Sequence, residues 1–273
     1  MVWVNGKLSD VIAVNDRSFL YGDGGFTTML TQNGAIQFWP LHQERMQTCL
    51  QTLAITEPDW TQVLDWLRIA ALPDEQAGLK LQITRGGGGR GYSPAGISQP
   101  NVIISHFGYP SHYLALQQQG ISLGICQRRL GINPMLAGHK HNNRLEQVLL
   151  KAEMDQSGHV DGIVLDIHGR VIETTMANLF WVRDRQLYTP KLESAGVAGV
   201  ARRLVIEHAP QLGLTVQIGE FGLEDVQQAT EIFITNSILG VAPVTQIGER
   251  SYSIGEETRR YQQSWSQGLF TQK

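Results

Sequence analysis

The chain has 273 residues, of which 42% are hydrophobic and 17% are charged, and its net charge is −3. This length favours two domains, at about 100–200 residues per domain, and the charge, with no basic run longer than two arginines, argues against a nucleic-acid partner. Cys49 and Cys126 are too few for a disulfide framework, and no apolar run reaches the roughly 18 residues of a membrane span, so we expect a cytoplasmic protein.

The amino-terminal part of the chain predicts a hairpin, a glycine-rich loop and a longer strand. Residues 1–6 (MVWVNG) are expected to form a strand that runs into a turn at Asn5-Gly6-Lys7. Residues 16–28 (DRSFLYGDGGFTT) place three glycines between aromatic residues, so the backbone there can closely approach either a ligand or an aromatic cluster. The alternating segment 29–38, interrupted at Asn33-Gly34, then predicts a strand.

Helices and strands follow in alternation up to residue 109. In the first helix His42 and Arg45 lie three residues apart, so both side chains can point the same way. Arg45 is therefore either a ligand-binding group or a solvated surface charge. The expected elements are helices at 41–55 and 60–72 and strands at 79–85 and 101–109.

Four consecutive glycines occupy residues 86–89, directly after a predicted strand. They suggest a phosphate cradle, but the chain lacks the GxxxxGK[ST] pattern that would support one. A flexible lid that brings Arg90 and Tyr92 to a ligand fits the same residues. The segment therefore keeps both interpretations.

A proline-containing break at residues 110–120 marks the expected domain boundary. We expect a smaller α/β domain at residues 1–113 and a larger domain at residues 114–273. The second domain begins with a strand at 121–128, and a loop bearing Lys140 precedes a helix at 143–154.

The remainder of the chain is rich in short strands. The start of one helix, Gly199-Val200-Ala201, offers exposed amides that would suit a phosphate group. The expected elements are strands at 161–166, 170–173, 178–182, 186–188, 215–218 and 231–235, helices at 196–212, 223–228 and 256–270, and a loop at 236–240.

Lys140 has an unusual sequence environment. His139, His141 and Arg144 surround it, and no acidic residue occurs before Glu146. An amine is a nucleophile only when neutral, and desolvation or nearby positive charge lowers the pKa of a lysine. Lys140 is therefore a candidate for Schiff-base formation, although a solvated loop lysine is the commoner case.

Together with Lys140, several other residues provide the chemical groups that a pyridoxal phosphate site needs. Such a site needs a lysine, an acid beside the pyridine nitrogen, and a cup of amides with a hydroxyl or arginine for the phosphate. Any one of these residues could be structural, but all of them in a workable order favour the cofactor. The candidates are Lys140, Glu173, the amides at Val200 and Ala201, Ser237 and Arg45.

These motifs resemble the fold-type IV pyridoxal phosphate enzymes, which include branched-chain and D-amino acid aminotransferases and aminodeoxychorismate lyases. Residues 16–26 resemble the amino-terminal signature of that family, and His42 with Arg45 resembles its HxxR helix. Lys140 and Glu173 have the family's lysine-to-acid spacing of 33 residues. Asn178 follows the acid by five positions. Residues 199–202 resemble the segment whose amides hold the phosphate in that family, except that Ala201 stands where aminotransferases often have threonine.

Within the family the likeness is greatest to the aminodeoxychorismate lyases. It rests on longer strings than the signatures shared by the whole fold. Thr27-Thr28 after Phe26 also departs from the Phe-Glu form of the aminotransferases. The strings that carry this likeness are RGGGGRGYS at 85–93, LGINP at 130–134, LAGHKH at 136–141 and NRLEQVL at 143–149.

The resemblance implies a two-domain mixed α+β or α/β architecture, D-amino acid aminotransferase-like, with pyridoxal 5′-phosphate at the domain interface. Residues 114–273 would form the cofactor-binding domain of a homodimer. The implied reaction converts 4-amino-4-deoxychorismate to 4-aminobenzoate and pyruvate in folate synthesis. Lys140 would remove a ring proton, and Lys140 or Thr28 would protonate the leaving group.

The resemblance also implies roles in binding. Glu173 would keep the pyridine nitrogen protonated, and a planar guanidinium is suited to the substrate's carboxylates. The implied cofactor residues are Lys140, Glu173, Asn178, Arg45, Val200, Ala201, Asn236 and Ser237, and the nominated substrate residues are Arg90, Tyr92 and Tyr109.

Two other functions are compatible with the same residues. A fold-type IV aminotransferase acting on D- or branched-chain amino acids would use Lys140 and Glu173, but would convert the cofactor to its pyridoxamine form. A non-catalytic protein could instead bind an anion at the glycines 86–89, with Lys140 merely exposed. That protein would be colourless when purified.

Overall fold

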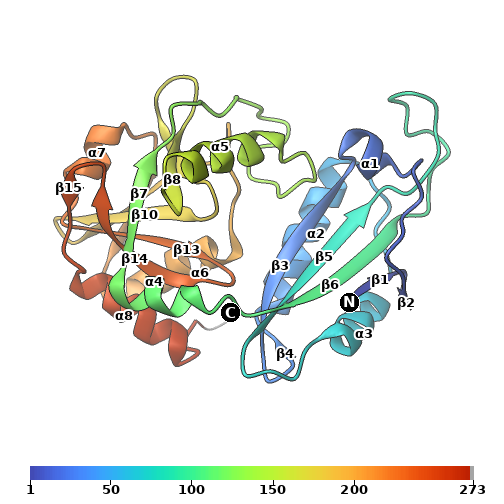
Figure 1. Ribbon diagram of the computed structural model, residues 1–273, viewed down its shortest axis with the longest axis horizontal. Coiled ribbons are helices and arrows are strands. Elements are labelled where there is room, and N and C mark those ends of the chain that lie inside the picture. Colours follow the sequence, from blue (N-terminus) through green and yellow to red (C-terminus); the bar gives the residue numbers. More distant parts are fainter. Residues whose placement is uncertain (271–273) are drawn as a thin grey trace. The chain divides into compact units, whose positions relative to one another are not determined.

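The computed structural model describes residues 1–270, and the chain divides into two compact units (Figure 1). The N-terminal unit comprises Met1–Tyr109 and His139–Arg144. The C-terminal unit comprises Pro110–Gly138 and the chain from Leu145 onward. The short segment that bears Lys140 therefore belongs to the N-terminal unit, although it is encoded within the second half of the sequence.

The N-terminal unit is built on a six-stranded sheet in which all neighbouring strands are antiparallel. The predicted hairpin at Asn5-Gly6 is confirmed, because the two strands that flank it pair directly. In sheet order the strands are β2 (Lys7–Leu8), β1 (Val2–Val4), β6 (Asn101–Gly108), β5 (Ala77–Thr84), β3 (Gly24–Gln32) and β4 (Ala35–Ile36).

Two helices, α2 (Trp39–Thr52) and α3 (Trp60–Ala70), pack against one face of this sheet. Pro40 lies in the first turn of α2, where its missing N–H has no intrahelical partner to lose. Asp59 caps α3 by accepting the N–H of Thr61 at 2.9 Å. Both helices were expected from their spacing, and their ends lie within three residues of those predicted.

The two faces of the sheet carry different side chains. Successive residues of a strand point to opposite faces, so Leu79, Leu81 and Ile83 of β5 all enter the core under the helices, where they are fully buried. Lys80 and Gln82 alternate with them and are only partly buried. These two side chains therefore point to the face opposite α2 and α3.

The glycine-rich segment differs from the predicted loop. It contains a short helix, α1 (Arg17–Tyr21), which Asp16 caps by accepting the Ser18 N–H at 2.8 Å and which ends at Gly22 with a φ of 67°. Strand β3 then begins at Gly24, earlier than the predicted start at residue 29. Glycine disfavours a strand by propensity, but here the lack of side chains permits the close contacts described below.

The C-terminal unit contains a nine-stranded mixed sheet. Strand β12 is parallel to β11, and β7 is parallel to both β14 and β8. In sheet order the strands are β12 (Thr215–Gly219), β11 (Gln186–Pro190), β10 (Asn178–Arg183), β13 (Glu231–Asn236), β14 (Gly240–Ile247), β7 (Ile121–Ile125), β8 (Asp161–Leu165) and β9 (Val171–Thr174), with β15 (Arg250–Ser251) beside β14.

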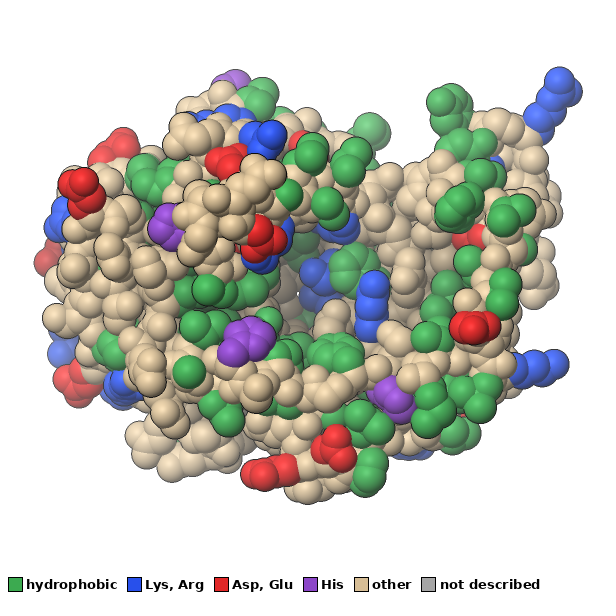
Figure 2. Space-filling view, viewed as in Figure 1, with side chains coloured by type: hydrophobic (Ala, Val, Ile, Leu, Met, Phe, Trp, Pro, Cys, Tyr) green, Lys and Arg blue, Asp and Glu red, His purple; other side chains and the backbone are tan. Residues whose placement is uncertain are grey.

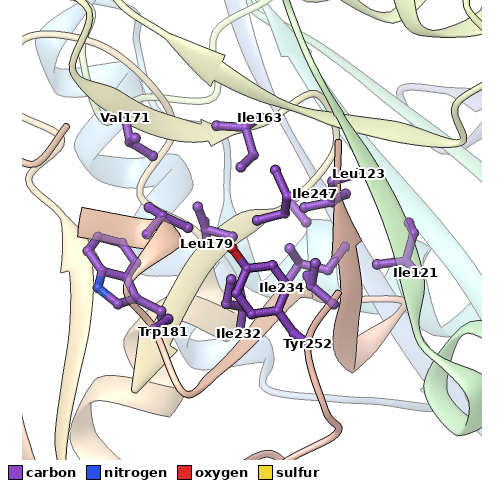
Figure 3. Packing of buried hydrophobic residues seen from close by; sticks show 14 of the residues in the cluster. Ile121, Leu123, Ile163, Val171, Leu179, Trp181, Ile232, Ile234, Ile247 and Tyr252 are labelled. Carbon is purple, nitrogen blue, oxygen red and sulfur yellow. The ribbon is translucent and has the colours of Figure 1, made fainter. Parts of the chain in front are cut away.

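Helices pack against this sheet, and the strands and helices together enclose a large apolar core. Helices α4 and α8 lie against β14, α5 against β8 and α6 against β13. Figure 3 shows Leu179 and Trp181 of β10 packed with Ile232 and Ile234 of β13, and all four are almost fully buried. The helices are α4 (His112–Gln119), α5 (Leu145–Gln156), α6 (Val200–His208), α7 (Leu223–Gln227) and α8 (Glu256–Ser266), with a 3₁₀ turn at Ala209–Leu212.

Three elements of the C-terminal unit were not predicted: strand β14, helix α4 and the two-residue strand β15. Strand β14 contains Pro243, which lacks the N–H that an interior strand normally donates, and its pairing with β7 shifts register between Val244 and Gln246. Helix α4 is short and buries no residue fully, although Tyr113 and Leu116 pack against the core. Strand β14 was therefore hidden, because the usual pattern is absent from it.

The described helices and the face of the C-terminal unit in Figure 2 bear on the expectations from composition. None of the helices within residues 1–270 is long and apolar enough to cross a bilayer. Figure 2 shows acidic and basic side chains interspersed over the face of the C-terminal unit that is in view. This mixture agrees with the small net charge of −3.

Candidate active site

The backbone around Lys140 is paired with the start of β3. The Phe26 N–H donates to the carbonyl of Lys140 at 2.9 Å, and the Asn142 N–H donates to the carbonyl of Gly24 at 2.9 Å. A Cβ atom on Gly25 would lie 2.7 Å from Cys49 Sγ, so no larger residue fits there without displacing its neighbours. The glycine-rich segment therefore serves as the surface on which the lysine loop is held.

The lysine loop is stabilised from within by an arginine. Arg144 donates to the carbonyls of His139 at 2.9 Å and His141 at 2.7 Å. Burial lowers the pKa of both histidines, and for His141 burial, with the charge of Arg144 and the neighbouring His139, lowers the pKa to about 4. Both imidazoles are thus neutral at pH 7, and Arg144 is the fixed positive charge of the loop.

Two lysines contact the same aromatic ring. Lys140 Nζ lies 4.7 Å from the centroid of the Phe26 ring, and Lys80 Nζ lies 4.8 Å from it. Phe26 and Thr28 occupy alternate positions of β3, and Thr28 pairs with Lys80 across the sheet. Lys80, Phe26 and Thr28 therefore share the face of the sheet that α2 and α3 leave uncovered.

Arg45 takes part in a buried chain of polar groups. It donates an Nη2–H to Thr27 Oγ1, which lies 2.6 Å from His42 Nδ1. Arginine cannot accept a hydrogen bond, so Thr27 Oγ1 is the acceptor in its contact with Arg45, while the same oxygen stays within hydrogen-bond distance of the His42 ring. Burial, with the charge of Arg45, lowers the pKa of His42 well below its usual value, so its imidazole is neutral at pH 7.

The Arg45 guanidinium is incompletely satisfied. Its Nε is buried and has no hydrogen-bond partner within residues 1–270, and burial lowers the pKa of Arg45 to about 10. A buried donor without a partner carries a free-energy cost, which an anionic ligand would remove. Arg45 is therefore not the solvated surface charge that sequence alone also allowed.

The glycine loop at residues 86–93 is anchored by Arg17. Arg17 donates to the carbonyls of Gly91 at 3.0 Å and Tyr92 at 2.9 Å. Burial would raise the pKa of Asp23, but its hydrogen bonds to Arg85 and Arg17 outweigh that effect and lower it. The loop backbone is thus attached to a buried ion-pair cluster.

The three nominated substrate residues lie in different environments. The side chains of Arg90 and Tyr92 are exposed, and Tyr92 is 86% exposed. Tyr109 is half-buried at the end of the N-terminal unit. Their roles in substrate binding stay predictions.

In the C-terminal unit Glu173 is held by the loop that precedes α6. It lies on β9, is 7% exposed, and accepts the Val197 N–H at 3.0 Å. Asn178 on β10 donates to Glu173 at 3.5 Å and to the Val197 carbonyl at 2.8 Å, and it accepts the Gly199 N–H at 3.2 Å. The carboxylate and the helix start are therefore positioned by the same asparagine.

The start of α6 offers free backbone donors. Gly199 is its N-cap and no side chain caps it, so the first-turn N–H groups of Val200 and Ala201 lack intrahelical acceptors. A Cβ atom on Gly199 would lie 2.3 Å from Asn178 Oδ1, which explains the glycine. Arg202, in the same turn, donates to the Pro190 carbonyl at 2.9 Å, and burial lowers its pKa to about 10.

The loop between β13 and β14 holds the remaining predicted cofactor residues. Asn236 accepts the N–H groups of Ile238 at 2.9 Å and Leu239 at 2.8 Å, which fixes the turn. Ser237 lies half-buried inside that turn. Gly138, two residues before Lys140 in the sequence, pairs with Val197 of the segment that contacts Glu173.

Sequence reasoning missed Thr27 and Lys80. Thr27 was seen only as part of a departure from the aminotransferase motif, and its link to Arg45 depends on β3 and α2 being adjacent. Lys80 carries a signal that could have been used, because it is a lone cation between Leu79 and Leu81 in an alternating strand.

Comparison with known proteins identifies the family. Residues 24–247 match the family described as Amino-transferase class IV. The chain is 52% identical to an aminodeoxychorismate lyase from Vibrio harveyi, over 96% of this chain and 98% of that protein.

Solved structures agree with this family and confirm the predicted fold class. A 4-amino-4-deoxychorismate lyase from Pseudomonas aeruginosa matches with a TM-score of 0.93 at 37% identity, covering 99% of this chain and 100% of that one. The Escherichia coli branched-chain amino acid aminotransferase matches with a TM-score of 0.86 at 25% identity, covering 99% and 94%. The chain therefore belongs to the amino-transferase class IV family.

Proposed function

We propose that the chain is a pyridoxal phosphate-dependent lyase that converts 4-amino-4-deoxychorismate to 4-aminobenzoate and pyruvate. The observation that carries this proposal is the 52% identity to the Vibrio harveyi lyase over nearly the full length of both chains. The branched-chain aminotransferase of Escherichia coli reaches 28% over a similar span. A place in folate synthesis, a cytoplasmic location and a homodimer belong to the same proposal.

The residues of each unit fit the proposed cofactor. Lys140 would be its covalent attachment point, and Glu173 would accept a hydrogen bond from the protonated pyridine nitrogen. The unpartnered Nε of Arg45 and the uncapped amides of Val200 and Ala201 are suited to a phosphate. Ser237 and Asn236 would complete the phosphate contacts, and Asn178 would hold Glu173 in place.

One aminotransferase-like contact is replaced in this scheme. Ala201 has no hydroxyl, so position 201 would contribute only its backbone N–H to the phosphate. Arg45 would then carry a larger share of the binding, because a charged donor forms a stronger hydrogen bond than a neutral one. This assignment fits a guanidinium that its own unit leaves incompletely bonded.

The chemistry needs one proton removed and one delivered. Pyridoxal phosphate supplies an electron sink for the charge that develops on the carbon bearing the substrate amine. The Lys140 amine would take the proton from that ring carbon. As the ether bond to the enolpyruvyl group breaks, Lys140 or the Thr28 hydroxyl would protonate the methylene carbon to give pyruvate, and the ring becomes aromatic. Substrate and the two products balance without water or an oxidant.

An aminotransferase on the same fold is the runner-up, because the Escherichia coli enzyme superposes on this chain with a TM-score of 0.86. It would use the same lysine and the same carboxylate. It would differ by transferring the amine of a plain amino acid to the cofactor and releasing a keto acid.

The visible spectrum and the products test the proposal together. The purified protein, reconstituted with pyridoxal phosphate, should absorb in the visible range, and Lys140→Ala should lose both the band and the activity, since no other residue is proposed to hold the cofactor covalently. Lys191→Ala, at an exposed lysine of the other unit, is the matched control.

With 4-amino-4-deoxychorismate added, equal amounts of pyruvate and 4-aminobenzoate should appear. A visible band without pyruvate, but with conversion to the pyridoxamine form by an amino acid, would replace the lyase with the aminotransferase. No band after reconstitution would leave only the anion-binding alternative.

A further inference from the structure

The uncovered face of the N-terminal sheet carries a second amine beside the proposed catalytic lysine. Phe26 and Thr28 of β3 lie across from Gln82 and Lys80 of β5 in register. Because Leu79 and Leu81 enter the core beneath α2 and α3, Lys80 points to the other face. Its amino group reaches the ring of Phe26, 4.8 Å from the centroid.

The same ring is contacted by Lys140, 4.7 Å from the centroid. A cation over an aromatic face is attracted by the quadrupole of the ring, which orients a lysine but supplies no counter-charge. Phe26 therefore holds two amines at one place on the sheet. One is the proposed attachment point, and the other has no role in the scheme above.

Lys80 is a partly buried cation with no counter-ion in the part of the chain that the structure describes. No acidic side chain within residues 1–270 forms an ion pair with it. Burial alone lowers the pKa of Lys80, and no carboxylate opposes that effect. Partly buried charges are normally paired, because an unpaired one loses hydration without compensation.

Four other basic residues of this unit are paired, exposed to solvent or on the opposite face of the sheet. Arg17 and Arg85 are paired with Asp23. Arg90 is exposed to solvent and needs no partner to be hydrated. Arg45 lies on the helix side of β3, bonded to Thr27. Lys80 thus lies on the face of Phe26 and Thr28 without an ion pair among the described residues.

We propose that Lys80 binds a carboxylate of the substrate and so determines specificity for an amine that also carries carboxylate groups. This inference rests on the proposed function, in which the substrate is a dicarboxylate whose amine reacts at Lys140. Lys80 would hold one carboxylate while the amine is presented to the neighbouring lysine. A plain hydrophobic amino acid has no second carboxylate for this contact.

The test measures binding separately from turnover. Chorismate carries both carboxylates but has a hydroxyl in place of the amine, so its binding to the cofactor-loaded protein can be followed by calorimetry without reaction. We expect Lys80→Met to weaken chorismate binding about tenfold to a hundredfold, the range for a lost hydrogen bond to a charged group. Lys80→Arg should restore most of it, and Lys7→Met, at an exposed lysine of β2, should leave it unchanged.

The kinetics give a second readout. For Lys80→Met the KM for 4-amino-4-deoxychorismate should rise by a similar factor, with a smaller change in kcat and an unaltered visible spectrum, because the residue does not touch the reacting bonds. Competition by 4-aminobenzoate, which keeps only the ring carboxylate, identifies the group. If Lys80→Met binds 4-aminobenzoate more weakly than the wild type, Lys80 binds the ring carboxylate. If 4-aminobenzoate binds equally well but chorismate binds more weakly, Lys80 binds the enolpyruvyl carboxylate.

A Lys80→Met protein that keeps its visible band and binds chorismate like the wild type overturns the proposal. If Lys80→Met does not fold, Lys80→Gln and Lys80→Arg replace it. Weaker chorismate binding in Lys80→Gln than in Lys80→Arg supports the proposal, and equal binding in both overturns it. Wild-type protein that binds chorismate through Lys80 but releases no pyruvate would refute the lyase function and leave the carboxylate site standing.

Discussion

Arg45 illustrates how the orientation of one side chain depends on two neighbours. Thr27 Oγ1 accepts a hydrogen bond from the guanidinium and lies 2.6 Å from His42 Nδ1. This chain of three polar groups holds the guanidinium in a defined orientation. If Arg45 binds the phosphate, Thr27 is a positioning residue for that contact.

Thr27→Val tests this dependence, because valine has nearly the same shape and lacks the hydroxyl. We expect the affinity for pyridoxal phosphate to fall about tenfold, equivalent to roughly 1.4 kcal/mol, while Thr27→Ser keeps it within about twofold. Equilibrium titration of the apoprotein measures both values.

Pyridoxal, which has no phosphate, is the control ligand for that titration. Its affinity should not change between the wild type and Thr27→Val. Equal weakening of both ligands would mean that the hydroxyl supports the fold locally and has no specific link to phosphate binding.

The neutral His42 has a consequence for acid stability. Its pKa lies well below 6.5 in the folded protein, as does the pKa of His141, at about 4. The unfolded chain therefore binds more protons between these limits, and the free energy of unfolding should fall as the pH drops from about 6.5 toward 4. Above pH 6.5 this contribution is fully present.

Urea unfolding at a series of pH values measures that slope. His42→Asn provides an amide oxygen near the position of Nδ1 and cannot titrate, so its unfolding free energy should depend less on pH in the same window. His168→Asn, at an exposed turn, should keep the wild-type slope. A wild-type slope in His42→Asn would contradict the assigned neutral state.

At the scale of elements, α8 depends on a residue from a strand. Its N-cap is Gly255, which offers no side chain, and Glu231 of β13 supplies the acceptor instead. The Glu231 carboxylate accepts the Thr258 N–H at 2.8 Å, the Thr258 hydroxyl at 2.8 Å and the Glu257 N–H at 3.2 Å. A negative charge at a helix start also interacts favourably with the helix dipole.

Glu231→Ala should therefore lower the free energy of unfolding by about 2–3 kcal/mol, since it removes a cap and leaves buried donors unsatisfied. Denaturant unfolding of the holoprotein measures the change. Glu207→Ala, which breaks an exposed pair with Arg203 on α6, should change stability by less than about 0.5 kcal/mol. Similar small effects for both variants would exclude the capping role.

How far the sequence predicts each element depends on whether its pattern is local. Spacing located α2 and α3, because both bury an apolar stripe that recurs every three or four residues. Strand β14 was missed because Pro243 is tolerated only through its neighbours. For the site, Lys140 and Glu173 stood out through a known spacing, whereas the Thr27–Arg45 contact has no signature before two elements are brought together.

At the scale of the whole molecule, the N-terminal unit is not one continuous stretch of sequence, because it also contains His139–Arg144. The expected boundary near residue 113 follows from a proline-containing break, which is a local signal. No local signal marks His139–Arg144 as part of the N-terminal unit. That membership depends on backbone hydrogen bonds to Gly24 and Phe26, which are over a hundred residues away in sequence.

This interleaving constrains how the chain can mature on the ribosome. Domains commonly fold during synthesis in order from the amino terminus, at about 5–20 residues per second. Here the sheet of the N-terminal unit is complete at Gly108, yet its last segment, His139–Arg144, emerges only after the first strand of the C-terminal unit. The edge formed by Gly24 and Phe26 must wait uncovered in the nascent chain, so the proposed catalytic lysine is placed only by a late, long-range closure.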